Sequence, residues 1–157
     1  RYAYLAGEAE MAGVPHDVCL ATRVAATAGE PGPRWRLTLH DPCYLGRHNG
    51  EFDAPRAILA RLCADAPMEF ALSREKAMCC GAGGGRMWLE ETIGKRINIT
   101  RVEQALEAAP QVIATACPYC AVMVGDGLAA AQPGGTTQSR DIAELVAEAL
   151  VAEPVRP

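Results

Sequence analysis

The sequence predicts an α/β fold in which helices flank a parallel β-sheet. Residues 35–40 alternate in hydrophobicity, as in a half-buried strand, and residues 111–116 contain a continuous apolar run, as in a fully buried strand. Between and after these runs lie stretches with the apolar spacing of helices, of which residues 141–150 are the clearest. Strands that alternate with helices in this way favour a parallel sheet.

The first half of this pattern is a strand, a helix and a shorter strand. The strand at 35–40 ends at Asp41-Pro42, because a residue before proline avoids the helical region and proline lacks an N–H donor. Residues 54–62 are predicted to be helical, with Pro55 in the first turn, where proline is tolerated. Residues 68–72 are predicted to form a short strand.

The second half continues the alternation of helices and strands. Residues 87–108 carry apolar side chains spaced by four and are predicted to be mostly helical, with Gly94 and Asn98 as points of division. The buried strand at 111–116 is followed by a predicted helix at 118–131. The last helix, 141–150, is expected to begin with a capping box of Asp141 and Glu144 and to be stopped by proline.

The chain is expected to contain one domain, preceded by a shorter N-terminal segment. Residues 35–152 are expected to form a single cysteine-rich domain of ordinary size. Residues 1–34 are expected to be the tail of a preceding domain or an N-terminal βα extension, with a strand at 14–20 and a helix at 23–28. The first residue is not methionine, so we expect a longer parent protein in which a membrane segment or further cofactor domains precede this chain.

Composition narrows the class of protein. A formal net charge of −4 over 157 residues argues against nucleic-acid binding, which requires a basic face. No apolar run approaches the roughly 20 residues of a membrane span. Seven cysteines, five of them grouped, indicate intracellular metal or redox chemistry rather than a disulfide-stapled secreted domain. The other two, Cys19 and Cys63, are predicted to be small buried hydrophobic residues. A cytoplasmic location is expected, with peripheral attachment to the cytoplasmic membrane through the parent protein.

Five cysteines provide the main functional signal. Thirty-five residues separate Cys43 from the pair Cys79-Cys80, and thirty-six more precede Cys117 and Cys120, which stand in the sequence Cys-Pro-Tyr-Cys. Loops after the carboxyl ends of parallel strands meet at one edge of a sheet, so these cysteines are expected to converge there. Two adjacent cysteines suit neighbouring metals of a cluster better than a single tetrahedral zinc ion.

Two features beside the cysteines support ligand chemistry. Cys117 and Cys120 begin a helix, whose free N–H groups and dipole are expected to lower the cysteine pKa and favour the thiolate. A glycine-rich loop follows the cysteine pair and allows close backbone approach. The N–H groups of Gly81, Gly83 and Gly84 are predicted to hydrogen-bond a bound cluster and to tune its reduction potential.

These motifs resemble the cysteine-rich CCG domain of a superfamily that includes the B-type subunit of heterodisulfide reductase and the iron–sulfur subunit of glycolate oxidase. The matching stretches are residues 40–46 (HDPCYLG), 79–85 (CCGAGGG) and 117–120 (CPYC). The resemblance covers about residues 35–150. Residues 44–49 and 86–88 look most like electron-transfer-flavoprotein dehydrogenase-like (Fe–S)-binding proteins.

The resemblance implies a function in electron transfer. It makes all five cysteines ligands of a 4Fe–4S cluster, of the non-cubane type in heterodisulfide reductase. Related proteins have an upstream ferredoxin-type domain, associate with membranes and pass electrons from a flavoprotein to quinone. We therefore expect an electron-transfer module of a heterodisulfide reductase-like oxidoreductase, which passes electrons between a flavoprotein and a quinone, a second cluster or a disulfide.

Other functions remain open from the residues alone. Zinc bound by part of the cysteine set would make the chain a structural or docking domain without a redox role. A thiol–disulfide enzyme using Cys117 and Cys120 fits their spacing but leaves the other three cysteines unexplained. A phosphate-binding loop at the glycine run is set aside, because the Walker lysine and its Ser/Thr are absent.

Polar and aromatic residues near the motifs each have two interpretations. His40 and His48 would touch the cluster or relay protons, or else cap loops. Arg47 and Arg86 would offset cluster charge or bind an anion, or else be ordinary surface residues. Trp88 would shield the cluster or cover the core.

Overall fold

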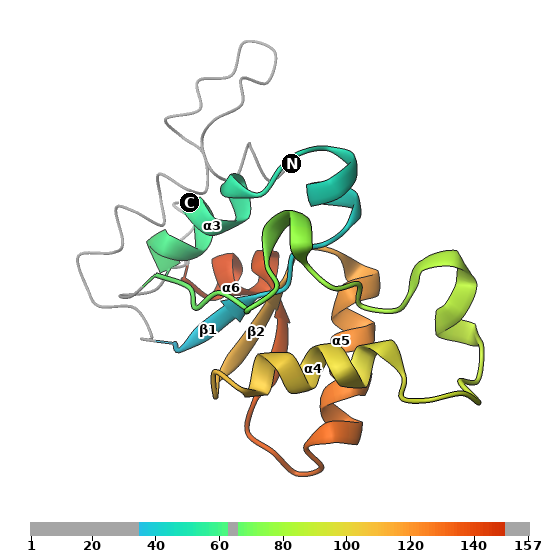
Figure 1. Ribbon diagram of the computed structural model, residues 1–157. Coiled ribbons are helices and arrows are strands. Elements are labelled where there is room, and N and C mark those ends of the chain that lie inside the picture. Colours follow the sequence, from blue (N-terminus) through green and yellow to red (C-terminus); the bar gives the residue numbers. More distant parts are fainter. Residues whose placement is uncertain (1–34, 63–65, 150–157) are drawn as a thin grey trace, which may run out of the picture.

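A three-stranded parallel sheet lies at the centre of the computed structural model, which describes residues 35–62 and 66–149 (Figure 1). The strands are β1 (Leu37–Leu39), β2 (Val112–Thr115) and β3 (Gln138–Asp141), in the order β1-β2-β3. Leu37 pairs with Val112, which in turn pairs with Gln138. The predicted α/β class with a parallel sheet is confirmed.

Two pairs of helices cover the two faces of this sheet (Figure 1). α3 (Asp53–Leu62) packs with α6 (Ile142–Ala149) on one face, and α4 (Ile97–Leu106) packs with α5 (Pro118–Ala131) on the other. Strand side chains alternate between the layers, as the pleat requires. Val112 and Ala114 face the first pair of helices, whereas Ile113 faces the second.

Three short helical turns lie in the loops: Tyr44–His48 in π geometry, and Arg74–Lys76 and Gly83–Trp88 in 3₁₀ geometry. None of the helices in the described ranges is long and apolar enough to cross a membrane. The predictions for residues 1–34, including the strand at 14–20 and the helix at 23–28, lie outside the described residues, as do Cys19 and Cys63.

The predicted helix at 87–108 is wrong in its first half. The helix α4 begins only at Ile97, and residues 89–96 form an irregular segment that extends from the body of the domain (Figure 1). Leu89 and Ile93 are exposed, so their spacing by four does not reflect burial on a helix. Gly94 has a φ of +73°, which is incompatible with a continuous right-handed helix.

The strands at the edges of the sheet also differ from expectation. β3 was not predicted, because its sequence Gln-Ser-Arg-Asp is polar and it is only partly buried. The predicted strand at 68–72 is reduced to one bridge between Thr38 and Met68. The capping box at the start of α6 is confirmed: the Asp141 amide donates to Glu144 Oε2 at 2.9 Å, and the Ala143 amide donates to Asp141 Oδ1 at 2.8 Å.

The tight packing of α4 against α5 at Gly127 leads to a first prediction. A Cβ added at Gly127 would lie 2.8 Å from the Asn98 carbonyl oxygen and 2.8 Å from Val102 Cγ2, whereas one added at Gly125 would meet nothing within 4 Å. We expect Gly127→Ala to lower the free energy of unfolding by about 1–3 kcal/mol through overpacking. Gly125→Ala is the matched control and should raise it by about 0.5–1 kcal/mol, since alanine favours a helix. Urea denaturation measures both, and equal effects would contradict the close packing.

Candidate metal centre

The cysteines of the sequence motifs come together beyond the carboxyl ends of β1 and β2. Cys43 follows β1, Cys117 follows β2 at the N-cap of α5, and Cys120 lies in the first turn of that helix. The adjacent pair comes from the loop between the turns at Arg74–Lys76 and Gly83–Trp88. All five are free thiols: Cys43, Cys79, Cys80, Cys117 and Cys120. Three segments far apart in sequence therefore contribute sulfur atoms to one region.

The thiols differ in depth. Cys80 and Cys120 are buried and pack together with Met123, Cys79 and Cys117 are half-buried beside them, and Cys43 is exposed. Burial raises the pKa of Cys43, and the nearby Cys79, Cys80 and Cys117 raise it further. The sulfur atoms therefore run from the protein interior to its surface.

The two buried thiols, Cys80 and Cys120, are hydrogen-bonded to each other. A hydrogen bond from Cys120 lowers the pKa of Cys80 to about 4 in spite of burial, with help from His40 and the Ala82 amide. The same hydrogen bond, together with burial, raises the pKa of Cys120. The expectation that the helix start lowers the pKa is therefore wrong for Cys120, because hydrogen-bond donation to Cys80 and burial outweigh the helix dipole.

Within the glycine-rich loop, Gly81 contacts a cysteine through its backbone, as the neighbouring Ala82 amide does at Cys80. The Gly81 amide donates to Cys79 Sγ at 3.3 Å. Gly81 has a φ of +92°, and an added Cβ would lie 3.1 Å from Ile97 Cβ, so both conformation and space require glycine. Gly83 and Gly84 are exposed, and an added Cβ at either would meet nothing within 4 Å.

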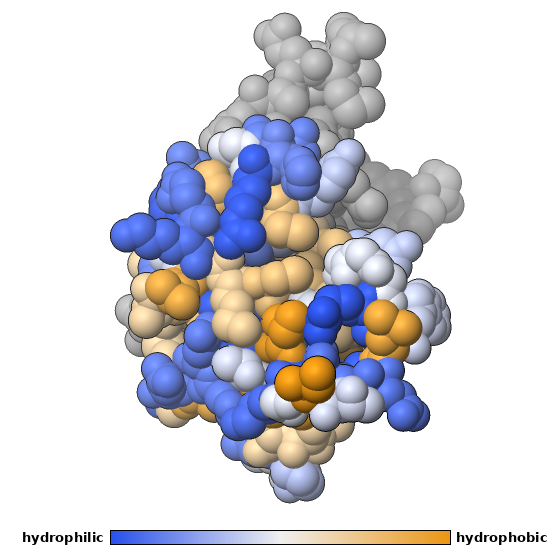
Figure 2. Space-filling view, turned by 45° about the vertical axis from the view of Figure 1, so that its right-hand side comes forward, coloured by the Kyte–Doolittle hydropathy of each residue, from blue (hydrophilic) through white to orange (hydrophobic). Residues whose placement is uncertain are grey.

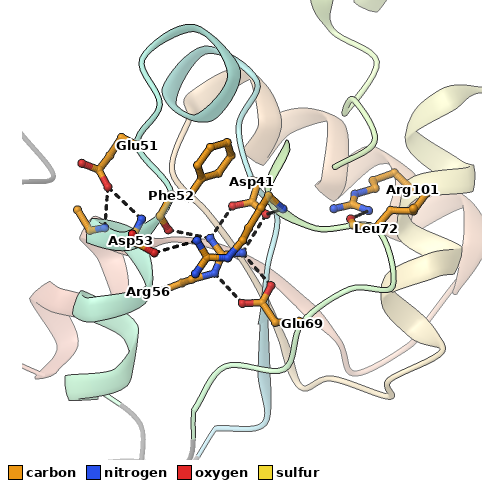
Figure 3. A network of polar contacts seen from close by, with 10 residues as sticks. Asp41, Glu51, Phe52, Asp53, Arg56, Glu69, Leu72 and Arg101 are labelled. Atoms are coloured by element: carbon orange, nitrogen blue, oxygen red, sulfur yellow. Dashed lines mark hydrogen bonds and ion pairs between the residues drawn. The ribbon is translucent and has the colours of Figure 1, made fainter. Parts of the chain in front are cut away.

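An ion-pair network holds the turn that leads to Cys43 (Figure 3). Asp41 accepts from Arg56 Nη1 at 2.7 Å and from Arg56 Nη2 at 3.0 Å, and also from the Arg74 amide at 2.7 Å. Arg56 donates further to Glu69 through Nε at 2.6 Å and Nη2 at 2.7 Å. Burial raises the pKa of Asp41, but these bonds outweigh it and the pKa lies below its ordinary value. The network joins the Cys43 turn to α3 and to the segment before Cys79.

Arg47 forms a second link between the two cysteine loops. Its Nε donates to the Glu75 carbonyl at 3.3 Å, and its Nη2 donates to the Ala77 carbonyl. Both carbonyls belong to the segment immediately before the cysteine pair. Arg47 therefore fixes backbone position rather than behaving as an unattached surface residue.

The remaining candidates lie at the surface. Arg86 forms an ion pair with Glu91. His48 is exposed and stacks near Tyr44, with ring centroids 5.3 Å apart. Trp88 is 81% exposed, so the interpretation that it covers the core is wrong.

Sequence reasoning missed a buried arginine at this site. Arg101 lies on the buried face of α4, is 1% exposed and stacks on Phe70, with its Cζ 3.7 Å from the ring centroid. It donates through Nε to His40 Nδ1 at 3.1 Å. It also donates through Nη1 to the Leu72 carbonyl at 3.1 Å (Figure 3). The sequence offered one indication of this burial, because Arg101 lies next to Val102 in the apolar stripe of α4.

Arg101 places a buried positive charge at the site, which suits a group of net negative charge. Within residues 35–62 and 66–149 no carboxylate forms an ion pair with Arg101, and its Nη2 has no hydrogen-bond partner. Burial lowers its pKa to about 10, so it stays charged at neutral pH, and the nearby Asp41 and Cys120 favour the charge. A buried cation beside several thiols fits a thiolate-ligated metal group of net negative charge.

Apolar side chains are exposed around the same region. Figure 2 shows strongly hydrophobic residues separated by hydrophilic ones on the face that it presents. Among the large apolar and aromatic side chains that are exposed, those closest in sequence to the cysteines and to the loop after the cysteine pair form what we name the apolar rim: Tyr44, Trp88, Leu89, Ile93, Tyr119 and Val122. Exposed apolar side chains can mark a contact surface, and the rim lies next in sequence to the cysteine loops, so we treat it as a candidate contact surface.

The sequence motifs and the gathered cysteines agree with one protein family. The family model described as CCG, cysteine-rich domain, matches residues 37–125, which include all five cysteines. The chain belongs to this family. The resemblance inferred from the motifs is thereby confirmed for the CCG domain.

Curated relatives of this CCG domain are named as redox proteins. It is 46% identical over 120 residues to the probable iron–sulfur-binding oxidoreductase FadF of Bacillus subtilis, covering 76% of this chain and 17% of FadF. It is 43% identical over 122 residues to the EtfAB:quinone oxidoreductase of Syntrophomonas wolfei, and the match covers 73% of this chain and 17% of that protein. It is 40% identical over 114 residues to a subunit of the dihydromethanophenazine:CoB–CoM heterodisulfide reductase of Methanosarcina barkeri, and the match covers 73% of this chain and 27% of that subunit. The chain thus spans between about a sixth and about a quarter of these relatives.

Proposed function

We propose that this CCG domain is an iron–sulfur electron-transfer module of a heterodisulfide reductase-like oxidoreductase. The observation that carries the proposal is the gathering of five free thiols from three segments at the carboxyl ends of β1 and β2. The relatives support it, since they are named as an iron–sulfur-binding oxidoreductase, a quinone oxidoreductase and part of a heterodisulfide reductase.

The residues that would hold the group are the five cysteines and the first glycine of the loop. A 4Fe–4S cluster, of the cubane or non-cubane type, supplies one-electron transfer when bound. Cys80 and Cys120 would bind its buried side and Cys43 its exposed side, in keeping with their different depths. The Gly81 amide, which already donates to Cys79 Sγ, would stabilise negative charge on that sulfur. Gly83 and Gly84 are proposed to add N–H donors from the same loop.

The exposed side of the site is the proposed place of electron exchange. Cys43 is solvent-accessible and the apolar rim begins at the next residue, Tyr44. A redox partner that packed on the rim would exclude water and come close to the cluster. The relatives' names favour a flavoprotein as donor and a quinone, a second cluster or a disulfide as acceptor. We propose a cytoplasmic location, with ferredoxin-type and membrane parts of the parent protein providing any attachment to the cytoplasmic membrane.

Anaerobic reconstitution of this chain with iron and sulfide tests the proposal directly. We expect about four irons and four sulfides per chain, and an EPR signal that changes between the oxidised and reduced forms. The control is the same treatment with zinc alone.

Zinc is the second candidate, because ligand atoms of His40, Cys80 and Cys120 lie within 4.8 Å of one another. One tightly bound zinc per chain, with no retention of iron or acid-labile sulfide, would replace the redox proposal with a structural or docking role.

A further inference from the structure

His40 lies between a buried cation and the buried thiols. It is 1% exposed, and its backbone amide donates to the Ala114 carbonyl at 2.9 Å, which holds it at the end of β1. On one side, Arg101 Nε donates to His40 Nδ1 at 3.1 Å. On the other, a ring nitrogen of His40 lies within 4.8 Å of the Cys80 and Cys120 sulfurs. The histidine therefore connects α4 to the candidate metal centre.

The hydrogen bond from Arg101 decides which ring nitrogen of His40 carries the proton. A guanidinium has only donors, so the nitrogen that it contacts must be an acceptor. Nδ1 is therefore without a hydrogen, and the proton of the neutral ring is on Nε2. Nε2–H is then the only group of the ring that can donate to a sulfur.

Arg101 is held firmly enough to enforce this choice. Its Nη1 donates to the Leu72 carbonyl at 3.1 Å and to Gln104 Oε1 at 3.0 Å, and its plane stacks on Phe70. These contacts fix the guanidinium from three directions in a site that excludes water. A rotation of the ring of His40 would turn a carbon or an N–H toward Nε of Arg101 and break the bond.

We propose that Arg101 holds His40 in the Nε2–H tautomer, and that His40 is a positioning residue that donates a hydrogen bond to the Cys80 sulfur and raises the reduction potential of a cluster bound there. The predicted effect on reduction potential rests on the proposed function, whereas the predicted tautomer of His40 does not. Reduction adds negative charge to the cluster and its thiolates, so a donor to a ligand sulfur stabilises the reduced form more than the oxidised form.

The same geometry argues against His40 as a metal ligand. A nitrogen that carries a hydrogen has no lone pair for a metal, and the other nitrogen is occupied by Arg101. Although His40, Cys80 and Cys120 have the proximity of a metal site, the histidine then acts on the ligand and not on the metal.

NMR of the cluster-free, reduced chain tests the tautomer without a cluster. Long-range ¹H–¹⁵N spectra should show the His40 ring protonated at Nε2 and unprotonated at Nδ1. In Arg101→Lys, which keeps the charge but lacks the Nε donor, the two tautomers should become mixed. An Nδ1–H tautomer in the unsubstituted chain would overturn the inference.

A matched pair of substitutions tests the effect on potential in the reconstituted chain. The amide nitrogen of His40→Gln reaches about the place of Nε2 and keeps a donor toward Cys80, whereas the shorter His40→Asn reaches only the place of Nδ1. We expect His40→Asn to keep its iron and sulfide but to shift the redox equilibrium about tenfold toward the oxidised form, which is about 59 mV for one electron. His40→Gln should restore most of this shift. EPR-monitored redox titration measures both.

Each other outcome has a distinct meaning. Loss of iron from both variants, with circular dichroism unchanged, would make His40 a ligand and overturn the inference. An unchanged reduction potential in His40→Asn would also overturn the inference. If the unsubstituted chain binds no cluster at all, the proposed function fails, and the NMR experiment still decides whether Arg101 sets the tautomer.

Discussion

Replacing Cys79 by serine is expected to remove most of the iron and sulfide from the reconstituted chain. Cys79 is half-buried next to Cys80, and its sulfur accepts a hydrogen bond from the Gly81 amide, so serine would place a hard, neutral hydroxyl where a soft thiolate ligand is needed. Loss of an outer partner alone typically weakens metal binding about 10–100-fold, and loss of a ligand should weaken it at least as much. Iron and sulfide assays after gel filtration measure the effect.

The control for this experiment is Cys63→Ser. Cys63 lies outside the predicted ligand set, so this variant should retain the iron and sulfide of the unsubstituted chain. Circular dichroism of both variants checks that the fold is kept. Equal retention in Cys79→Ser and Cys63→Ser would contradict a ligand role for Cys79, and equal loss would point to general damage to the chain.

Replacing Asp41 by asparagine is expected to cause the largest loss of stability among single polar substitutions at the site. The Asp41 side chain is 4% exposed and that of Arg56 is 11% exposed, so the substitution would break a buried, two-bonded ion pair. Removing one partner of a buried pair typically costs about 3–5 kcal/mol, and the remaining Glu69 contact places this case near the lower end, at about 3 kcal/mol. Urea denaturation at neutral pH measures the loss.

The pH dependence of stability provides a second measurement on Asp41. Its pKa is lower in the folded chain, because the Arg56 and Arg74 contacts outweigh the effect of burial. Its contribution is therefore complete above the unfolded pKa of about 3.9 and disappears as the pH falls through the folded value. The unsubstituted chain should lose this stability below about pH 4, and Asp41→Asn should lack that component.

Asp53→Asn is the matched control for both measurements. Asp53 also pairs with an arginine, Arg74, at 2.9 Å, but its side chain is 81% exposed. Its loss should change the free energy of unfolding by no more than about 0.5 kcal/mol. Similar losses of unfolding free energy from the two substitutions would show that burial does not make the Asp41–Arg56 pair more stabilising than the exposed Asp53–Arg74 pair.

Elements with a strong local signal could be predicted from the sequence. The helix α5 begins at Pro118 and ends at Ala131, as expected, because Pro118 suits a first turn and no proline follows until Pro133. The strand β2 was recognised from its apolar run, and the start of α6 from the capping box of Asp141 and Glu144. In each case the deciding interactions lie within a few residues.

Elements that depend on distant partners could not be predicted. The segment at 89–96 has helical spacing but no surface to pack against, so Leu89 and Ile93 remain exposed. β3 has a polar sequence and is a strand because it pairs with β2. Pairing through backbone hydrogen bonds does not require an alternating pattern of apolar side chains, so the sequence pattern does not predict it.

The sequence by itself determined the α/β class, the CCG family and the five cysteines that mark the candidate site, because these follow from local patterns and spacings. Only the tertiary structure decided how deeply each thiol lies and that Arg101 reaches His40 across sixty-one positions of the chain. An arginine is ordinarily a surface residue. Its burial here follows from the packing of α4 against α5 and of its own guanidinium on Phe70, and this packing sets the hydrogen bond at His40 and the charge beside the thiols.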